Sequence, residues 1–166
     1  MNEQKIVNAI MRPIAKADNS QLATLITKVM TEFLCVGEGY SINDPEVEKM
    51  YESYQGDGHA FWVIEAGDRI LGGGGIGPLV GGDSTVCELK KMYFYPELRG
   101  QGWGKRMIQQ CLSAAREFGY ETCYIETVER MTTAIGLYQK SGFSRISCQM
   151  GRTGHSSCET YFKMEL

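Results

Sequence analysis

Three glycines, Gly100, Gly102 and Gly104, lie within five residues of one another, between a predicted strand and a predicted helix. The first turn of a helix carries backbone N–H groups that have no partner inside the helix, and these groups attract anions. Lys105 and Arg106 follow at once, and cations at this end of a helix oppose its macrodipole unless an anion is bound nearby. The loop is therefore predicted to hold an anion.

The sequence predicts a strand before this loop and a helix after it, and these two elements must position the loop. Residues 86–95 are rich in apolar and aromatic side chains, and Pro96 ends the run because proline has no N–H to give to a strand partner. After the loop, apolar residues recur at the spacing of one helical face and stop before Gly119, a residue type common just after helices. They are Met107, Ile108, Cys111, Leu112, Ala115 and Phe118. A strand, a glycine loop and a helix of about four turns are predicted.

Two common nucleotide-binding patterns do not fit this loop. The P-loop would require glycine at position 99 and serine or threonine at position 106, and both positions hold arginine. The dinucleotide fingerprint would require a third glycine where Lys105 stands. Glycines at 72, 74 and 77 match that fingerprint by spacing, but no predicted helix follows them. An ordinary strand-to-helix turn without a ligand stays the alternative.

Composition restricts the class of protein. The chain has 166 residues, with 17 basic against 20 acidic residues and a pI near 5.5. This length predicts one domain over residues 1–166, and the charge balance argues against binding to nucleic acid or to an anionic membrane. The N-terminus lacks the apolar core of a signal peptide, and no apolar run reaches the length of a membrane span. A cytoplasmic protein is expected.

The cysteines point to reduced thiols rather than to a metal site. Six of them are widely spaced and form no Cys-x-x-Cys pair. His155 and Cys158 have Cys148 nearby, but a fourth ligand and paired spacing are missing. No metal is predicted.

Strands and helices alternate along the rest of the chain. Strands are expected at 9–12, 61–65, 69–76, 122–128, from 143 and at 161–165, and helices at 20–33, at 45–54 and from 132 or 133 to before 142. Four successive glycines, residues 72–75, weaken the strand that contains them and mark a bulge, a backbone close to a ligand or a flexible strand edge. The strand–helix–strand order around the glycine loop predicts a parallel crossover in a mixed sheet.

Three segments carry a family resemblance. Arg99-x-x-Gly102-x-Gly104 follows a strand that ends at Tyr95-Pro96-Glu97, residues 134–143 read Ala-Ile-x-Leu-Tyr-x-Lys-x-Gly-Phe, and Met11-Arg12-Pro13 precedes Asp18. Together these segments resemble the acyl-CoA signature, the second conserved helix and the opening of the GNAT superfamily of N-acetyltransferases. The resemblance spans about residues 9 to 166. It implies an α/β (α+β) fold, a mixed and mostly antiparallel sheet of six to seven strands flanked by about four helices, with acetyl-CoA as acyl donor.

The resemblance assigns the cofactor to the glycine loop and to the end of the strand before it. The implied residues are Met92, Tyr93 and Phe94, through backbone amides that bond the pantetheine arm and the acetyl oxygen; Arg99, Gly100, Gln101, Gly102, Trp103, Gly104 and Lys105 in the loop; and Tyr138. Met131 stands where the family commonly has an asparagine that bonds the pantetheine arm, so that contact is not expected here.

Acetyl transfer to an amine needs a base, because an aliphatic ammonium has a pKa of about 10, and an acid for the leaving thiolate. By resemblance Glu88 is the expected base, four residues before Met92, an offset that puts both side chains on one face of a regular strand. A surface glutamate, or one paired with Lys90, is the alternative. Tyr138 is the expected acid, with core packing as the alternative. His155 is either a loop residue or another base.

The resemblance leaves the acceptor open. A small-molecule amine or amino acid, which attacks directly in a ternary complex, is expected. The alternatives are a protein N-terminus or lysine, and a non-catalytic regulator that binds acyl-CoA. Residues 31–57 contain seven acidic residues and one basic residue, Lys49. These acids either form a solvated helix face or create a negative field that attracts a cationic amine. Edge strands in such a fold make a homodimer a further expectation.

Overall fold

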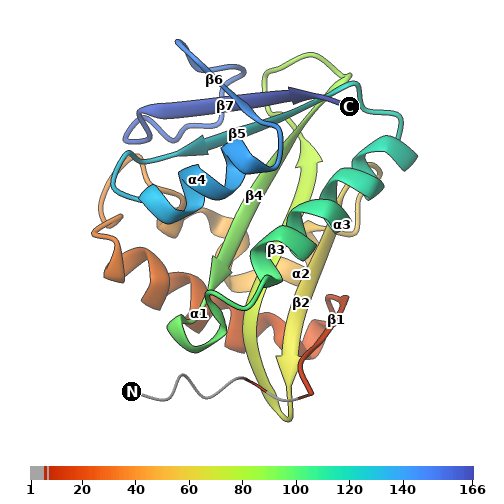
Figure 1. Cartoon of the computed structure of the whole chain (residues 1–166), viewed down its shortest axis with the longest axis vertical. Coiled ribbons are helices and arrows are strands. Elements are labelled where there is room, and N and C mark those ends of the chain that lie inside the picture. Colours follow the sequence, from red (N-terminus) through yellow and green to blue (C-terminus); the bar gives the residue numbers. More distant parts are fainter. Residues whose placement is uncertain (1–5, 7) are drawn as a thin grey trace.

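The described part of the chain forms one seven-stranded sheet in the order β1-β2-β3-β4-β5-β7-β6 (Figure 1). The strands are β1 Ile10–Pro13, β2 Ala60–Ala66, β3 Arg69–Pro78, β4 Val86–Phe94, β5 Thr122–Thr127, β6 Ser144–Ile146 and β7 Thr160–Glu165. Neighbouring strands are antiparallel except β4 and β5, which are parallel. The computed structural model describes residue 6 and residues 8–166. The predicted mixed, mostly antiparallel sheet is confirmed.

Helices cover both faces of this sheet. Within the described residues, α1 Asn19–Glu32 and α2 Met50–Ser53 lie on one face, and α3 Trp103–Glu117 and α4 Thr132–Lys140 on the other (Figure 1). The apolar stripe of α1 packs on β3 and β4, and that of α3 packs on β2 and β3. The chain passes from β4 through α3 to the parallel strand β5, which is the predicted crossover. No helix among the described residues is long and apolar enough to cross a membrane.

Two elements differ from the sequence prediction. The helix expected over 45–54 is divided into a 3-10 helix, Pro45–Lys49, and the single turn α2, because Lys49 leaves the helical region at φ −143° and ψ 49°. The strand expected from position 143 is reduced to the three residues of β6, which pair with β7 only.

Strand β3 continues through its four consecutive glycines. Its pairing with β4 shifts between Gly73 and Gly75, but the extra residue lies in β4, so the bulge belongs to the partner strand and not to the glycines. The strand extends to Pro78, where the sequence predicts a loop. At Gly75 a Cβ atom would lie 2.4 Å from the backbone oxygen of Ala60 and 2.5 Å from Cδ2 of Phe61. Glycine is required there because β2 lies too close for any side chain.

Gly75→Ala is expected to lower the free energy of unfolding by roughly 2–3 kcal/mol, because its methyl group would collide with backbone that the β2–β3 pairing holds in place. Gly136→Ala is the control, since nothing lies within 4 Å of a Cβ at that position in α4. It should stabilise the protein by about 0.5–1 kcal/mol through helix propensity. Urea unfolding measures both effects, and an unchanged stability of Gly75→Ala would contradict the close approach of β2.

Candidate active site

The parallel strands β4 and β5 separate after three residue pairs. Val86, Cys87 and Glu88 pair with Thr122, Cys123 and Tyr124. Among the described residues no later pair joins these two strands, although β4 continues to Phe94 beside β3. The two strands thus splay apart, which leaves one backbone edge of β4 without a partner strand among the described residues.

Two adjoining cavities lie where these strands separate. The first, of about 140 Å³, includes Arg99 and Gly104 in its wall, and we call it the loop cavity. The second, of about 70 Å³, includes Glu88 and His155 in its wall, and we call it the acid cavity. The residues that line both are Met92, Tyr93, Met131 and Ala134. The two cavities therefore adjoin, with one beside the glycine loop and the other beside the carboxylates.

The glycine loop enters α3 through residues in the left-handed region. Gly100 has φ +73° and Gly102 has φ +82°, backbone conformations that glycine adopts without steric cost. Gly104 lies so close to α4 that a Cβ atom would be 2.6 Å from Cδ2 of Leu137. The glycines thus present bare backbone at the N-terminus of α3, which is the arrangement that an anion needs.

The side chain of Arg99 is occupied by contacts within the protein. Its guanidinium donates to both carboxylate oxygens of Glu32 at 2.6 and 2.8 Å, and its Nε donates to the backbone oxygen of Phe94 at 2.9 Å. It also lies over the ring of Phe33. These contacts attach the glycine loop to α1 and to the end of β4. Contact of Arg99 with a cofactor stays a prediction, and its side chain positions the loop in this structure.

A bulge in β4 changes which of its residues share a face. Gly75 pairs with Lys90 and Gly73 pairs with Tyr93, so two residues of β4 lie opposite a single residue of β3. One of these two, Lys91, is in the left-handed region at φ +55°. An extra residue of this kind resets the alternation of side chains beyond it.

The prediction that Glu88 and Met92 share a face is wrong because of this bulge. Met92 packs into the core beside α3. Glu88 lies on the opposite face together with Lys90 and Lys91, which both approach Glu46. The sequence offset to Met92 therefore carries no information about where Glu88 points, although both residues line the acid cavity.

Glu88 is a buried carboxylate with no partner. Its relative exposure is 4%, and within the described part of the chain no donor forms a hydrogen bond or ion pair with it. Burial raises the pKa of Glu88 to about 7, although the charge of nearby Lys90 opposes this shift. Lys90 itself lies 3.5 Å from Glu46, so the expected alternative of a Glu88–Lys90 ion pair is not formed. A carboxylate with a pKa close to 7 suits proton transfer near neutral pH.

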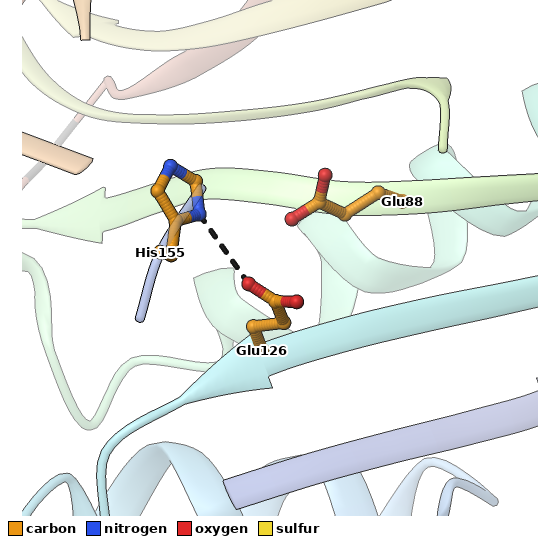
Figure 2. Close-up of side chains that lie close together, drawn as sticks. All are labelled: Glu88, Glu126 and His155. Carbon is orange, nitrogen blue, oxygen red and sulfur yellow. Dashed lines mark ion pairs between the residues drawn. The ribbon is translucent and has the colours of Figure 1, made fainter. Parts of the chain in front are cut away.

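His155 lies beside Glu88 and Glu126 (Figure 2). Its Nδ1 is 3.4 Å from Oε2 of Glu126, and its Nε2 is 3.0 Å from Oδ2 of Asp44. Burial disfavours the charged ring, but hydrogen bonds to Asp44 and Glu126 outweigh burial and raise the pKa of His155 to about 9. The ring is therefore an imidazolium at neutral pH. A ring that already carries both protons is unsuited to accept another near pH 7, and a role of His155 as a base stays an untested prediction.

Three side chains of this cluster could in principle hold a metal ion. Ligand atoms of Glu88, Glu126 and His155 lie within 4.8 Å of one another. Both ring nitrogens of His155 face carboxylates, however, and a doubly protonated imidazole has no lone pair to offer a metal. The arrangement favours a proton at this position, and the absence of a metal stays a prediction.

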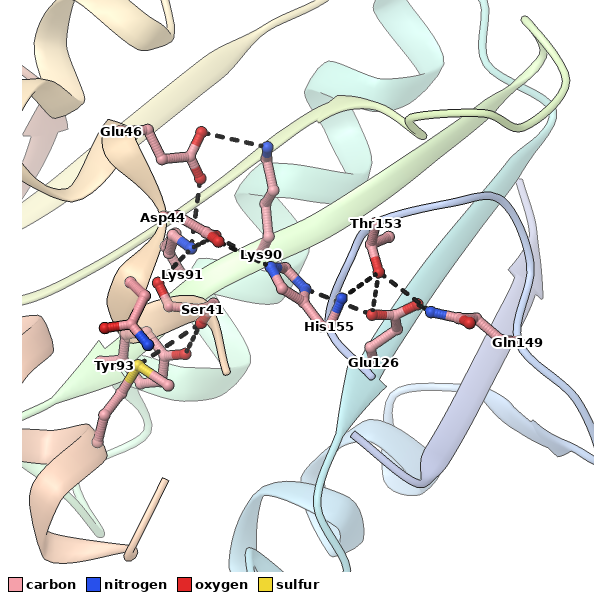
Figure 3. A network of polar contacts seen from close by, with 12 residues as sticks. Ser41, Asp44, Glu46, Lys90, Lys91, Tyr93, Glu126, Gln149, Thr153 and His155 are labelled. Carbon is pink, nitrogen blue, oxygen red and sulfur yellow. Dashed lines mark hydrogen bonds and ion pairs between the residues drawn. The ribbon is translucent and has the colours of Figure 1, made fainter. Parts of the chain in front are cut away.

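The polar network continues from His155 to β4 (Figure 3). Lys91, whose side chain is 1% exposed, contacts Asp44 and lies 3.4 Å from Glu46. It also donates to the backbone oxygen of Ser41 at 3.2 Å. Burial of such a lysine is tolerable because each of these contacts offsets the loss of its hydration. The bulge in β4 is what directs Lys91 towards these partners.

The acids of residues 31–57 are largely paired inside the protein. Glu32 contacts Arg99, Asp44 contacts Lys91 and His155, Glu46 contacts Lys90 and Lys91, and Glu52 contacts Lys16. Local cations thus compensate much of this charge. The field for a cationic amine is weaker than the count of acids in the sequence suggests.

Tyr138 of α4 combines packing with a place in the cavity wall. Its ring centroid is 6.2 Å from that of Phe143 and 6.1 Å from that of Phe162, and its side chain lines the acid cavity. Burial raises the pKa of Tyr138, so the phenol keeps its proton at neutral pH. Both expected readings, packing and proton donation, are compatible with this position.

Met131 occupies the start of α4, where the family commonly has asparagine. Its Sδ lies 3.5 Å from Oγ1 of Thr127, and its side chain lines both cavities. An apolar thioether therefore stands where an amide would offer hydrogen bonds to a pantetheine arm. The loss of this contact with the pantetheine arm stays a prediction.

Sequence reasoning missed Glu126 as a member of the site. It is the charged residue of β5, which reads Thr-Cys-Tyr-Ile-Glu-Thr, and its side chain is 1% exposed. A single carboxylate within an apolar strand was an available signal, because burial of a charge is costly unless partners offset it. No comparable signal marked Asp44 or Lys91, since their contact depends on the bulge.

Known proteins share this fold and sequence. Residues 26–143 match the acetyltransferase (GNAT) family. Uncharacterized N-acetyltransferase YjgM of Escherichia coli (strain K12) is 40% identical over 167 residues, with 100% of each chain covered. An acetyltransferase of the GNAT family from Staphylococcus aureus Mu50 has a TM-score of 0.82 at 19% identity, covering 95% of this chain and 99% of its own. The structure of yncA from Salmonella typhimurium, described with its cofactor acetyl-CoA, has a TM-score of 0.76 at 19% identity, covering 96% and 95%. The chain belongs to the GNAT family of acetyltransferases, which use acetyl-CoA as acyl donor.

Proposed function

We propose that this protein transfers the acetyl group of acetyl-CoA to the primary amine of a small molecule or amino acid, by direct attack in a ternary complex and without a metal. The observation that carries the proposal is the buried Glu88 carboxylate, which has no partner among the described residues and lines a cavity that adjoins the cavity at the glycine loop. We further propose a single catalytic domain over residues 1–166 in the cytoplasm, in keeping with six free cysteines.

In this proposal the cofactor lies along the loop cavity. The pyrophosphate binds the backbone of residues 100–105 at the N-terminus of α3, with Gln101, Trp103 and Lys105 beside it. The pantetheine arm runs along the open edge of β4 at residues 92–94. A backbone amide there donates to the acetyl oxygen and stabilises the negative charge that develops on it.

Gly102→Ala tests this placement, because a methyl group there would stand on the bare backbone that receives the pyrophosphate. We expect the Kd of acetyl-CoA to rise about tenfold, which corresponds to the loss of roughly 1.4 kcal/mol of binding free energy. Gly119→Ala is a matched control: φ is +82° at Gly102 and +83° at Gly119, and nothing lies within 4 Å of a Cβ at either position. Both variants should lose similar stability, and calorimetry should show weaker binding only for Gly102→Ala. Equal binding by both variants would place the cofactor elsewhere.

The proposed reaction uses two side chains. Glu88 takes a proton from the acceptor ammonium, directly or through a water molecule, because only the free amine is a nucleophile. The amine attacks the thioester carbonyl, and the nitrogen of the tetrahedral intermediate loses its excess proton to water. The carbon–sulfur bond then breaks and leaves the neutral amide. Tyr138 gives its proton to the leaving thiolate of CoA and regains a proton from water. Both side chains line the acid cavity, where these steps would meet.

A cover over the acid cavity favours a small acceptor. We define the cover as residues 37–44 and 149–158. The backbone N–H of Ser157 donates to the oxygen of Gly39 at 3.1 Å, its hydroxyl donates to the oxygen of Glu38 at 2.8 Å, and His155 contacts Asp44. A protein N-terminus or lysine would require these contacts to open. The enclosed volume of about 70 Å³ suits the reactive end of a small amine.

A thiol-release assay with acetyl-CoA tests the reaction across amino acids, polyamines, aminoglycosides and short peptides. Transfer to small amines supports the proposal, and transfer to peptides alone would replace it with a protein acetyltransferase. Silence across the panel, together with tight calorimetric binding of acetyl-CoA, would favour the non-catalytic regulator. Sedimentation would show whether the protein is the homodimer that we propose on the basis of its edge strands.

A further inference from the structure

We propose that His155 is a positioning residue for Glu88: as an imidazolium it joins Glu126 of β5 to Asp44 of the cover, and so leaves Glu88 as the free base of the acid cavity. This inference rests on the proposed function, because it assigns a role within the same reaction. It adds a residue from the cover to a mechanism otherwise built on β4 and α4.

The first step of the argument concerns the partners of each carboxylate in this region. Asp44 contacts Lys91 and His155, and Glu46 contacts Lys90 and Lys91. Glu126 accepts hydrogen bonds from Gln149 and Thr153 at 2.8 and 2.7 Å and also contacts His155 (Figure 3). It accepts a third hydrogen bond from the hydroxyl of Tyr124 at 2.8 Å. Among the described carboxylates that line the acid cavity or contact His155, Glu88 is the exception. A carboxylate without donors has its lone pairs available for an incoming proton.

The second step concerns the charge beside Glu88. Figure 2 shows its carboxylate directed towards Glu126 and His155. Two carboxylates this close raise each other's pKa unless a cation compensates one of them. His155 supplies that cation, because both of its ring nitrogens face carboxylates. Hydrogen bonds to His155 and to three neutral donors hold the pKa of Glu126 below its usual range, although burial opposes this shift.

Other groups that face Glu88 are unsuited to this role. They are Lys90 and Lys91 on β4, Tyr124 on β5, Tyr54 after α2, Asp44 and Glu46 at the start of the 3-10 helix Pro45–Lys49, and Cys158 before β7. The lysines are committed to Asp44 and Glu46. Burial raises the pKa of Tyr54, Tyr124 and Cys158, so each stays neutral near pH 7. Loss of the imidazolium would therefore remove the cation that contacts Glu126, and only the charges of Lys90 and Lys91 would still lower the pKa of Glu88.

Loss of the His155 charge should raise the pKa of Glu88 and lower the rate near neutral pH. Glu88 accepts a proton only when it is ionised, and its pKa is about 7 in the intact site. If His155→Gln raises this pKa by about one unit, the ionised fraction at pH 7 falls from about one half to about one tenth. The kcat/KM should then fall about fivefold at pH 7 and by less than twofold at pH 9, as the acid limb of the pH profile moves up by about one unit.

NMR titration of protein labelled with ¹³C at the glutamate carboxyl groups tests this without an acceptor. We expect the midpoint of Glu88 to rise by about one pH unit in His155→Gln and to fall in Glu126→Gln, which removes the neighbouring charge instead. The double variant should titrate close to the wild type, because the charge that His155 compensates is then absent. Lys163→Gln removes an exposed cation from β7 and should leave the midpoint unchanged.

Two results would overturn the proposal. The first is a His155 ring, followed by NMR in the unaltered protein, that loses its proton below pH 7. The second is an unmoved Glu88 midpoint in His155→Gln with a rate that falls equally at every pH, which is the behaviour of a purely structural residue. Absence of acetyl transfer by the wild type would instead remove the proposed function, while the carboxyl titration would still decide whether His155 governs Glu88.

Discussion

Replacement of Glu88 by Gln is expected to lower the turnover of acetyl transfer by at least about 100-fold near pH 8, with acetyl-CoA binding retained. A positioned general base contributes about 10²- to 10⁴-fold to such a reaction, and glutamine keeps the shape of glutamate without its basicity. In the wild type, turnover should rise with pH through a midpoint near the Glu88 pKa of about 7. The variant should lose this rise, and pH profiles of kcat and of kcat/KM measure the loss.

The same substitution should make the protein more stable at neutral and alkaline pH. The folded-state pKa of Glu88 is raised from 4.5 to about 7, so its ionisation destabilises the fold progressively from about pH 4.5 to pH 7 and by a constant amount above that. A shift of this size corresponds to at most roughly 3 kcal/mol. Glu88→Gln removes this destabilisation. The higher free energy of unfolding of the variant, measured in urea, should therefore disappear below about pH 4.5.

Glu117→Gln is the control for both measurements, because Glu117 is an exposed acid at the end of α3 and lines neither cavity. It should change neither turnover nor the pH dependence of stability. Wild-type turnover of Glu88→Gln at every pH would exclude Glu88 as the base. A rate loss that accompanies lower stability would point to misfolding instead.

Tyr138→Phe is expected to lower turnover at least about tenfold while acetyl-CoA still binds with its wild-type Kd. Without a proton donor, CoA must leave as the thiolate, whose thiol pKa is about 8.5, and the tetrahedral intermediate then returns more often to reactants. Phenylalanine retains the packing of the ring against Phe143 and Phe162. No hydrogen bond from the Tyr138 hydroxyl is formed to the described residues, so its removal should leave the melting temperature nearly unchanged.

Tyr120→Phe should give the opposite pattern. Its hydroxyl donates to the backbone oxygen of Gly58 at 3.0 Å, and its side chain lines neither cavity. Loss of this bond should cost about 1 kcal/mol of stability without affecting turnover. Single-turnover kinetics with calorimetric binding of acetyl-CoA compare the two variants. Wild-type turnover of Tyr138→Phe would restrict Tyr138 to core packing.

The local order of elements around the glycine loop could be predicted because local chemistry encodes it. Pro96 cannot continue a strand ladder, Gly100 and Gly102 adopt the left-handed backbone that the turn requires, and the apolar stripe of α3 has helical spacing. Each of these signals acts within a few residues of the chain. These signals could therefore be recognised in the sequence without knowledge of the fold.

Family membership could also be predicted from the sequence, and with it the class of sheet and the acyl donor. Motifs at the two ends of the chain and around the loop sufficed for this, since they describe backbone features that recur with the fold. The identity of the acceptor could not be predicted from the sequence. The residues that face it come from segments that no local pattern connects, and side chains there report on packing as much as on chemistry.

Only the tertiary structure decided how the catalytic candidates are arranged. A bulge at Lys91 places Glu88 and Met92 on opposite faces of β4, and this reversal depends on the pairing of β4 with β3. His155 meets Asp44 across 111 positions of sequence, because the cover brings both segments over the acid cavity. Periodicity and turn residues act over one element, whereas burial, charge compensation and a pKa depend on every neighbour in space. The sequence by itself determined the elements and the family and indicated Glu88 as the candidate base, whereas tertiary packing decided that this carboxylate is buried without a partner among the described residues.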